Sequence, residues 1–524
     1  MNDPPSALTT SGADEGEGRA PEGLPDVPNH ALVRATGSAR IDGNALRLQF
    51  EGSSTFEAWL EAIDGATRYV HFENYIIRDD RVGRAFRDAL VSKARAGVPV
   101  HLLYDWVGCW ATPRRYWRPL KDAGVVVRAF NPPSVRNPLG VFQRDHRKLV
   151  CVDGEVAFVG GFCVGAAWAG GRDRPPWRDT GVEIRGPAAA AASRAFERIW
   201  AEVGDPLPAG LREDARDRPQ VGDTPVWLIE GEPGRSRVYR ALTLVAAHAR
   251  ERLWITDPYF VAPAPVSQAL AAAARDGVDV RVLLPGTNNW PLVGSVSRSG
   301  YRFLMDAGVR LFEWQGPMIH AKTSVADGVW CRVGSSNLNA ASLLGNWEMD
   351  VGVLDEGLAG QLEGLFLADL ASSVEIVLPG VRVPVRAGDL PALREPPKHP
   401  LDPEGTLSQR LERELRASVS RRGTGAARIN LAHVVRASTI LGDALAGNRT
   451  LGREDRTVLG TVATLVLVMG IVAAFLPELV GWLVAVMLLW MGIVTGARAY
   501  FQARRARVEE RAPHVENEEA ETES

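Results

Sequence analysis

The feature that most constrains this chain is an internal repeat. Four sequence landmarks occur twice, in the same order, about 180 residues apart. A repeat of this length is too long for one unit of a solenoid and is typical of a duplicated domain. We therefore expect two similar domains that pack around a pseudo-two-fold axis. The paired landmarks are RYVHFENYII with RLWITDPYFV, ARAGVPVHLLYDW with ARDGVDVRVLLPG, DAGVVVRAF with DAGVRLFEW, and DHRKLVCVDG with IHAKTSVADG.

Within each copy, apolar strand-like runs alternate with alanine-rich helical runs. This alternation is typical of an α/β fold in which helices cover a sheet. We predict two α/β/α sandwich domains, at 31–218 and 219–390. The join between them falls in the polar stretch 211–225.

The two ends of the chain differ in composition from the repeats. Residues 1–30 are acidic and rich in proline and glycine, which predicts a disordered tail. Residues 457–476 and 479–497 are free of charged residues and long enough to span a bilayer as a helical hairpin. The flanking arginines predict that both ends of the hairpin, and hence the repeats, are cytoplasmic. The remaining segments are a linker with arginine-rich helices at 391–456 and a basic, then acidic tail at 498–524.

Charge and cysteine content exclude some classes of protein. The formal net charge of -3 does not give the basic field of a dedicated nucleic-acid binder. The four cysteines form no Cys-x-x-Cys pair, so neither a zinc site nor a disulfide framework is indicated. We expect no metal and no nucleic-acid partner.

The last landmark of each copy carries a His-x-Lys-x-x-x-x-Asp motif, and the two motifs are offset by 174 residues at all three positions. On a strand, residues two apart point to the same face, so each histidine should project beside its lysine. The chain has only five lysines, and two of them follow a histidine by two. This placement indicates a requirement for a compact ammonium group rather than for positive charge alone. The candidate catalytic residues are His146, Lys148, Asp153, His320, Lys322 and Asp327.

A turn of small residues follows each motif, GGFCVG at 160–165 and GSSNLN at 334–339. Gly161 permits close backbone approach, and Ser335 and Asn337 can donate to phosphate oxygens, so these three are candidate phosphate-binding residues. Farther along lie Asp179 and Glu348. A carboxylate that accepts the Nδ1 proton of a histidine fixes its tautomer, and these two are candidates for that role, with a plain salt bridge as the alternative.

These residues resemble the phospholipase D superfamily, and the WRDT run at 177–180 together with a membrane anchor resembles its bacterial cardiolipin synthase branch. The resemblance covers about residues 45–380. It implies a two-step, metal-independent transfer without a cofactor, in which one histidine attacks a phosphodiester and the other protonates the leaving alcohol. By similarity His146 is the nucleophile and His320 the general acid, although the sequence itself does not rank them.

The chemistry of these residue types is consistent with this scheme. Attack requires a neutral imidazole, leaving-group protonation requires a charged one, and lysines can offset charge on the phosphate oxygens. Asp153 and Asp327 stand seven residues from their histidines, a position more typical of local structure than of proton transfer. The chain departs from the family pattern at Cys163, which occupies the place matched by Asn337.

The resemblance, together with the membrane anchor, therefore implies a phosphatidyl transferase of the bacterial inner membrane that acts on phospholipids such as phosphatidylglycerol. Two alternatives remain open, a hydrolase of the phospholipase D type and, less favoured, a nuclease of the same superfamily. Trp106, Trp110 and Trp117 cluster in YDWVGCWATPRRYW, where packing or the border of an acyl-chain entrance are both compatible with the pattern.

Overall fold

The computed structural model shows that every helix and strand named below lies in one compact unit of the chain. The structure describes residues 24, 27–134, 140, 143–171, 175–211, 218–235, 237–287, 297–298, 300–377, 381–384 and 489. The predicted hairpin at 457–476 and 479–497, the linker and both tails lie almost entirely outside these residues.

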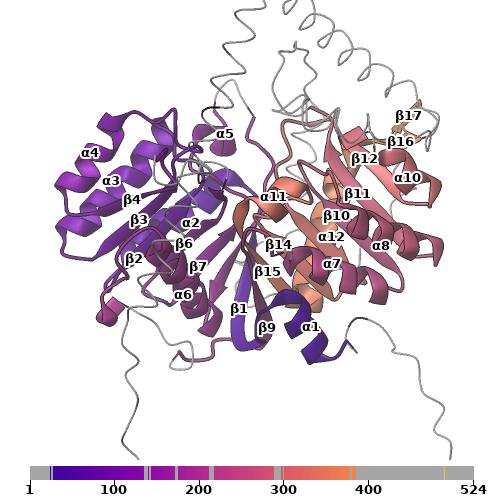
Figure 1. Cartoon of the computed structure of the whole chain (residues 1–524), viewed down its shortest axis with the longest axis horizontal. Coiled ribbons are helices and arrows are strands. Elements are labelled where there is room, and N and C mark those ends of the chain that lie inside the picture. Colours follow the sequence, from indigo (N-terminus) through magenta and orange to yellow (C-terminus); the bar gives the residue numbers. More distant parts are fainter. Residues whose placement is uncertain are drawn as a thin grey trace, which may run out of the picture. The chain divides into compact units, whose positions relative to one another are not determined.

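The two copies contain matching elements in matching order (Figure 1). The first half contains β1 (Ile41–Gln49), α2 (Gly52–Gly65), β2 (Val70–Asn74), α3 (Arg81–Arg95), β3 (Val100–Asp105), α4 (Arg114–Asp122), β4 (Val126–Phe130), β5 (Arg144–Asp145), β6 (Lys148–Val152), β7 (Val156–Gly160), α5 (Ala166–Ala169), β8 (Gly181–Arg185) and α6 (Pro187–Glu202). The second contains β9 (Thr224–Gly231), α7 (Arg237–His248), β10 (Arg252–Thr256), α8 (Ala264–Arg275), β11 (Asp279–Pro285), α10 (Tyr301–Asp306), β12 (Arg310–Trp314), β13 (Thr323–Ala326), β14 (Trp330–Gly334), α11 (Ala340–Leu344), β15 (Asn346–Leu354) and α12 (Glu356–Ala371). Outside this match are β5, which has no counterpart in the second half, and α1 (Asn29–Thr36), η3 (Ala209–Leu211), β16 (Ser373–Val377) and β17 (Val381–Pro384).

Each half builds one mixed sheet with the same strand order. In the first half the order is β4, β3, β2, β6, β7, β8 and β1, in which the first three strands are parallel and the others antiparallel. The second half repeats it as β12, β11, β10, β13, β14, β15 and β9. Beyond β12, that sheet gains β16 and β17. A short antiparallel pairing of β1 with β9 joins the two sheets.

Local sequence explains where several elements begin and turn. The side chain of Asp80 caps α3 by accepting from the amides of Val82 and Gly83, and Asp355 caps α12 in the same way. The hairpins β6–β7 and β13–β14 both turn at an Asp-Gly pair whose residues have positive φ. Such pairs are the preferred residues of a two-residue hairpin turn.

Three apolar clusters hold the layers together. The outer face of the first sheet packs on α2 to α5, and the outer face of the second packs on α1, α7, α8 and α10. A third cluster contains α6, α12 and the inner faces of both sheets, so the two halves share one core. Burial of this continuous apolar surface supplies the main force that holds the halves together.

The predicted mixed α/β fold is confirmed. Among the described residues, no helix combines the length and apolar character needed to cross a bilayer. The predicted hairpin is not part of what the structure describes, and it stays a prediction.

Candidate active site

The two motif histidines lie at equivalent places, immediately before β6 and β13. Lys148 is the first residue of β6, and Lys322 directly precedes β13. All four side chains are buried, with His146 7% and His320 5% exposed. Water therefore screens the charges of these four side chains only weakly.

The backbone around each histidine pairs with the other half of the molecule. Strand β5, just before His146, runs parallel to the start of β15, and the His146 amide donates to the carbonyl of Trp347 at 2.9 Å. Reciprocally, the His320 amide donates to the carbonyl of Arg178 at 2.6 Å. Each histidine is thus fixed by the segment that carries the opposite half's carboxylate.

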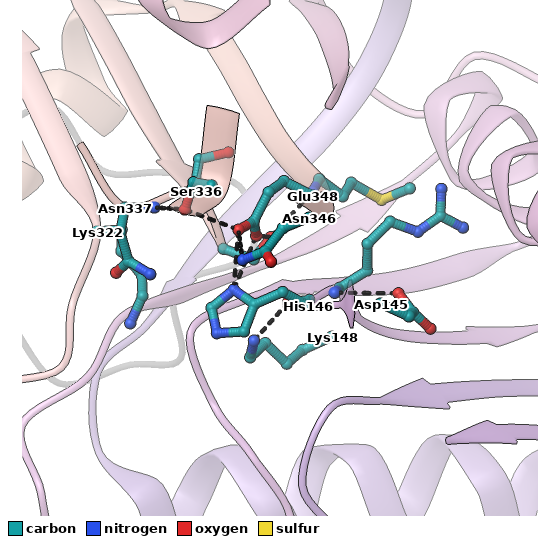
Figure 2. A network of polar contacts seen from close by, with 12 residues as sticks. Asp145, His146, Lys148, Lys322, Ser336, Asn337, Asn346 and Glu348 are labelled. Atoms are coloured by element: carbon teal, nitrogen blue, oxygen red, sulfur yellow. Dashed lines mark hydrogen bonds and ion pairs between the residues drawn. The ribbon is translucent and has the colours of Figure 1, made fainter. Parts of the chain in front are cut away.

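Glu348 of the second half holds His146 of the first. The distances from His146 Nδ1 to the two carboxylate oxygens are 2.9 and 3.0 Å (Figure 2). Ser335 Oγ donates to the same carboxylate at 2.6 Å, Ser342 Oγ at 2.9 Å and Asn346 Nδ2 at 3.0 Å. Burial alone would raise the pKa of Glu348, but His146, Lys148 and Ser335 outweigh it and lower that pKa.

Asp179 of the first half holds His320 of the second. The His320 Nδ1 atom lies 2.7 Å from Asp179 Oδ2, which also accepts from the Trp168 indole at 2.8 Å. The other oxygen of Asp179 accepts from the amide of Thr180 at 2.8 Å. Burial raises the pKa of Asp179, whereas the larger combined effect of His320, Lys322 and Trp168 lowers it below its usual value.

These two pairs define the tautomers of the histidines. Burial lowers the pKa of His146 to about 4, and burial with nearby Lys322 lowers the pKa of His320 to about 3. Both imidazoles are therefore neutral near pH 7, and a carboxylate at Nδ1 requires the proton there. The Nε2 lone pair of each ring is left to react.

The two lysines occupy different positions relative to their histidines. Lys148 Nζ donates to the carbonyl of His146 and lies 5.1 Å from the centroid of the Tyr75 ring. Lys322 Nζ donates to the carbonyl of His320 and also lies 2.9 and 3.0 Å from the two ring nitrogens. Burial lowers the pKa of Lys322 to about 8.

Aromatic rings also line the site, and the sequence motifs do not predict them as site residues. The Tyr75 ring lies 4.7 Å from the His146 ring. Trp168, Trp177 and Tyr259 surround His320 at 5.6 to 5.9 Å between ring centroids. The equivalent tyrosines, Tyr75 and Tyr259, stand in the first pair of repeat landmarks, which is the signal that identifies them in hindsight.

The three residues predicted to bind phosphate have different surroundings. Ser335 donates to Glu348, and its Oγ accepts from the amide of Met349. The amide of Gly161 donates to Thr180, and a Cβ at this position would lie 1.9 Å from Asp179, which explains the glycine. Only Asn337 keeps a free polar atom, because its Oδ1 is buried and makes no hydrogen bond within the described part of the chain. Figure 2 shows it beside Lys322 and His146.

The motif aspartates lie at the far ends of β6 and β13 from the histidines. Asp153 accepts from the amides of Thr67, Arg68 and Tyr69, and Asp327 accepts from those of residues 250–252. Although burial opposes it, these amide bonds lower the pKa of Asp153. The contacts anchor the starts of β2 and β10, which fits the expected role in local structure.

Cys163 lies at the position that Asn337 occupies in the other half. Its thiol is buried among apolar side chains, and burial raises its pKa, so it is a neutral group there. The phosphate-facing part of the site is therefore asymmetric. Among the described residues, no three or more His, Cys, Asp or Glu side chains are grouped to hold a metal ion.

Sequence reasoning missed several residues that support the site. Ser342 and Asn346 bond Glu348, and Trp168 bonds Asp179. Trp168 and Ser342 stand 174 residues apart, each after two alanines, so the repeat marks their positions in hindsight. No repeated position marks Asn346. The crossing of Asp179 and Glu348 to the opposite half's histidine was also not predicted.

Fold and site together define a class of protein in which duplicated α/β domains each contribute a buried His-Lys pair held by a carboxylate of the other domain. The family described as "Cardiolipin synthase, PLD-like domain" matches residues 59–200 and 244–370. The chain is 36% identical over 353 residues to cardiolipin synthase A of Pseudomonas aeruginosa, covering 66% of this chain and 71% of that one. It is 37% identical over 340 residues to cardiolipin synthase A of Pseudomonas fluorescens, covering 64% and 70%.

A solved structure shares the fold. The crystal structure of phosphatidylserine synthase from Haemophilus influenzae aligns with a TM-score of 0.50 at 14% identity, over 62% of this chain and 86% of that chain. The chain therefore belongs to the cardiolipin synthase family of phospholipase D-like proteins, and it is a phosphatidyl transferase of the cardiolipin synthase type.

Proposed function

We propose that the enzyme moves a phosphatidyl group from one phosphatidylglycerol to another, forming cardiolipin and releasing glycerol through a phosphohistidine intermediate. The observation that carries this proposal is the crossed arrangement of the two histidines. His146 is held by Glu348 and His320 by Asp179, so each reactive ring needs both halves of the molecule. A site built in this way supplies two histidines to one phosphate.

In the first step, Nε2 of His146 attacks phosphorus and the bond from phosphorus to the glycerol oxygen breaks. His320 donates its Nε2 proton to that oxygen, and glycerol leaves. In the second step, His320 takes the proton from the hydroxyl of the second phosphatidylglycerol, whose oxygen attacks phosphorus and releases His146. Lys148, Lys322 and the amide of Asn337 interact with the non-bridging oxygens, whose charge grows in each transition state.

The protonation states supply the neutral nucleophile that the first step needs. Both rings are neutral in the empty site, because burial lowers the pKa of His146 to about 4 and that of His320 to about 3. A neutral ring is what the nucleophile needs. The bound phosphodiester anion raises the pKa of the other ring by direct attraction and draws Lys322 away from it, which lets His320 carry the proton of a general acid.

The location of the enzyme in the cell is a further part of the proposal. We infer that the enzyme works at the cytoplasmic face of the bacterial inner membrane and is anchored by residues 457–476 and 479–497. The support for this location is the apolar character of the two stretches and the arginines that flank them.

The test uses the purified full chain and its His320→Ala variant, each reconstituted with phosphatidylglycerol. A matched control is His30→Ala, which removes an exposed histidine on α1. Mass spectrometry should detect cardiolipin and glycerol with the wild type and with His30→Ala. With His320→Ala, both products should fall at least about 1,000-fold, since the general acid and base is lost.

Two results would contradict the proposal. Phosphatidic acid without cardiolipin would show that water, not a lipid alcohol, resolves the intermediate. Cleavage of single-stranded DNA without any change in phosphatidylglycerol would remove the lipid substrate altogether.

A further inference from the structure

Two exposed tryptophans lie on the loop between β3 and α4. Trp110 is 74% exposed and Trp106 37% exposed, whereas most tryptophans that the structure describes are buried. Exposing large aromatic rings to water is unfavourable, and their amphipathic character suits the boundary between water and lipid. Packing within the domain therefore does not explain these two side chains.

The loop is attached to the site by a series of close contacts. A Cβ at Gly108 would lie 1.9 Å from the carbonyl oxygen of Tyr75, so only glycine allows this approach. The thiol of Cys109 accepts from the amide of Ile77 at 3.2 Å. Because the Tyr75 ring lies 4.7 Å from the His146 ring, one residue connects the loop directly with the reacting group.

A second set of contacts fixes the base of the loop. Asp105, the last residue of β3, pairs with Arg144 at 3.1 Å and accepts from the amide of Asp145 at 3.0 Å. Asp145 directly precedes His146. The loop that carries the exposed tryptophans is thus fixed to the strand that leads to His146.

Basic residues follow the tryptophans on α4. Arg114, Arg115 and Arg118 are all exposed, and the side chains of Arg115 and Arg118 are 80% and 83% exposed. Between Trp106 and Asp122 there are four basic residues and one acidic residue, although the whole chain has a net charge of -3. Arginine in the first turn of a helix interacts unfavourably with the helix dipole, so helix stability does not explain Arg114. Arg115 lies 3.3 Å from Asp79 and Arg118 3.6 Å from Asp122, but such exposed ion pairs contribute little to stability.

We propose that Trp106, Trp110, Arg114, Arg115 and Arg118 form a docking surface for an anionic phospholipid bilayer. The tryptophans enter the headgroup region, and the arginines bind lipid phosphates. This inference rests on the proposed function, because the surface would present His146 to lipids in the plane of the bilayer. It assigns to the first half a membrane contact that is separate from residues 457–497.

The experiment compares one substrate in two physical forms. The full chain is reconstituted in phosphatidylcholine vesicles and supplied with long-chain phosphatidylglycerol in the bilayer, or with short-chain phosphatidylglycerol dissolved as monomers. The variants are Trp106→Ala with Trp110→Ala, and Arg114→Gln with Arg118→Gln. The control is Val221→Ser. Val221 is an exposed apolar residue just before β9, and the length of β9 separates it from the end of that strand that pairs with Glu348.

We expect both double variants to lose roughly tenfold of their activity on the bilayer substrate and less than about twofold on the monomeric substrate. At high salt the difference between the wild type and the arginine variant should shrink, because salt screens the arginines of the wild type. The control should match the wild type on both forms. Equal losses on both forms, or no loss on either, would overturn the docking surface.

A second measurement does not depend on catalysis. Brominated phosphatidylglycerol quenches tryptophans that enter the bilayer, so the wild type should lose more fluorescence than a Trp106→Phe, Trp110→Phe variant. Equal quenching of the two proteins would overturn the proposal and would instead favour a protein partner for this surface. A wild type that is quenched more than this variant but is inactive on both substrate forms would refute the proposed function and keep the docking surface.

Discussion

The two halves share their reactive groups but differ in the buried charges behind them. In the first half, Arg147 makes a two-pronged ion pair with Glu73, at 2.8 and 3.0 Å, next to Asp145. Where the first half has Asp145 and Arg147, the second has the apolar residues Ile319 and Ala321. The residues on either side of His146, just before β6, therefore belong to an ionic network, whereas the matching residues on either side of His320 are apolar.

The reverse holds on the neighbouring strands. In the second half, Arg332 pairs with Asp350 at 2.6 Å, and Ser336 donates to the same carboxylate. The first half has Phe158 and Phe162 in place of Arg332 and Ser336, and the Phe162 ring packs against a glycine of β8. The histidines and lysines therefore stand at equivalent positions in the two halves, whereas the buried residues around them differ. Two unequal environments suit a reaction in which one histidine is a nucleophile and the other an acid.

The largest effect should come from the histidines themselves. We expect His146→Ala and His320→Ala each to lower kcat at least about 1,000-fold on phosphatidylglycerol. A phosphatidyl ester of p-nitrophenol should separate their roles, because this leaving group departs without protonation. On it, release of p-nitrophenol should recover roughly 100-fold or more in His320→Ala and stay lost in His146→Ala. Recovery in the opposite variant would reverse the assigned roles.

The crossed carboxylates should come next. Glu348→Gln and Asp179→Asn should each lower kcat about 100- to 10,000-fold, because an amide no longer fixes the histidine tautomer. Since Glu348 raises the pKa of His146 and Asp179 that of His320, each variant should lower the pKa of the histidine from the opposite half. NMR titration of the two imidazoles measures this directly. A shift in the same-half histidine instead would disprove the crossing.

The first-half ion pair can be tested by removing one partner. Arg147→Met should destabilise the fold by about 3–5 kcal/mol, because Glu73 and Asp145 would remain buried without their cation. A matched variant replaces all three with the second-half residues at the same strand positions, Thr256, Ile319 and Ala321, as Glu73→Thr, Asp145→Ile and Arg147→Ala. This variant should recover most of the loss, measured by urea denaturation. A triple variant less stable than Arg147→Met would show that the pair stabilises the first half on balance.

The smallest expected effect concerns pH and is confined to the first half. His71 and His101 are neighbours on β2 and β3, and the second half has Trp254 and Arg281 there. Burial lowers the pKa of His71 well below its usual value, and burial with nearby Arg128 lowers that of His101 to about 4. The unfolded chain therefore binds more protons below about pH 6.5, and stability should fall as pH falls from there toward 4.

His101 alone should cost about 2 kcal/mol between pH 7 and pH 5. A His101→Phe variant, compared with wild type by urea denaturation at both pH values, should lose correspondingly less stability on acidification. The same pH dependence in the two proteins would show that His101 is not the source.

Much of the site could be predicted because its parts repeat along the chain. The positions of His146, Lys148, His320 and Lys322 follow from one spacing that occurs twice, and strand geometry places each histidine near its lysine. The phosphate-binding prediction was less complete. Ser335 and Gly161 have the right residue types, but their donors are engaged by Glu348 and Thr180, and sequence spacing contains no information about such competition.

The sequence by itself determined the duplication, the alternating strands and helices, the two reactive sets and the carboxylates available to them. Only the tertiary structure decided which carboxylate serves which histidine. Asp179 lies 33 residues from His146 in the sequence but holds His320, and Glu348 lies 28 residues from His320 but holds His146. The reason is physical, because β5 pairs with β15, and the segment before His320 pairs with Arg178. Partners across such pairings are set by the packing of two domains, and not by distance along the chain.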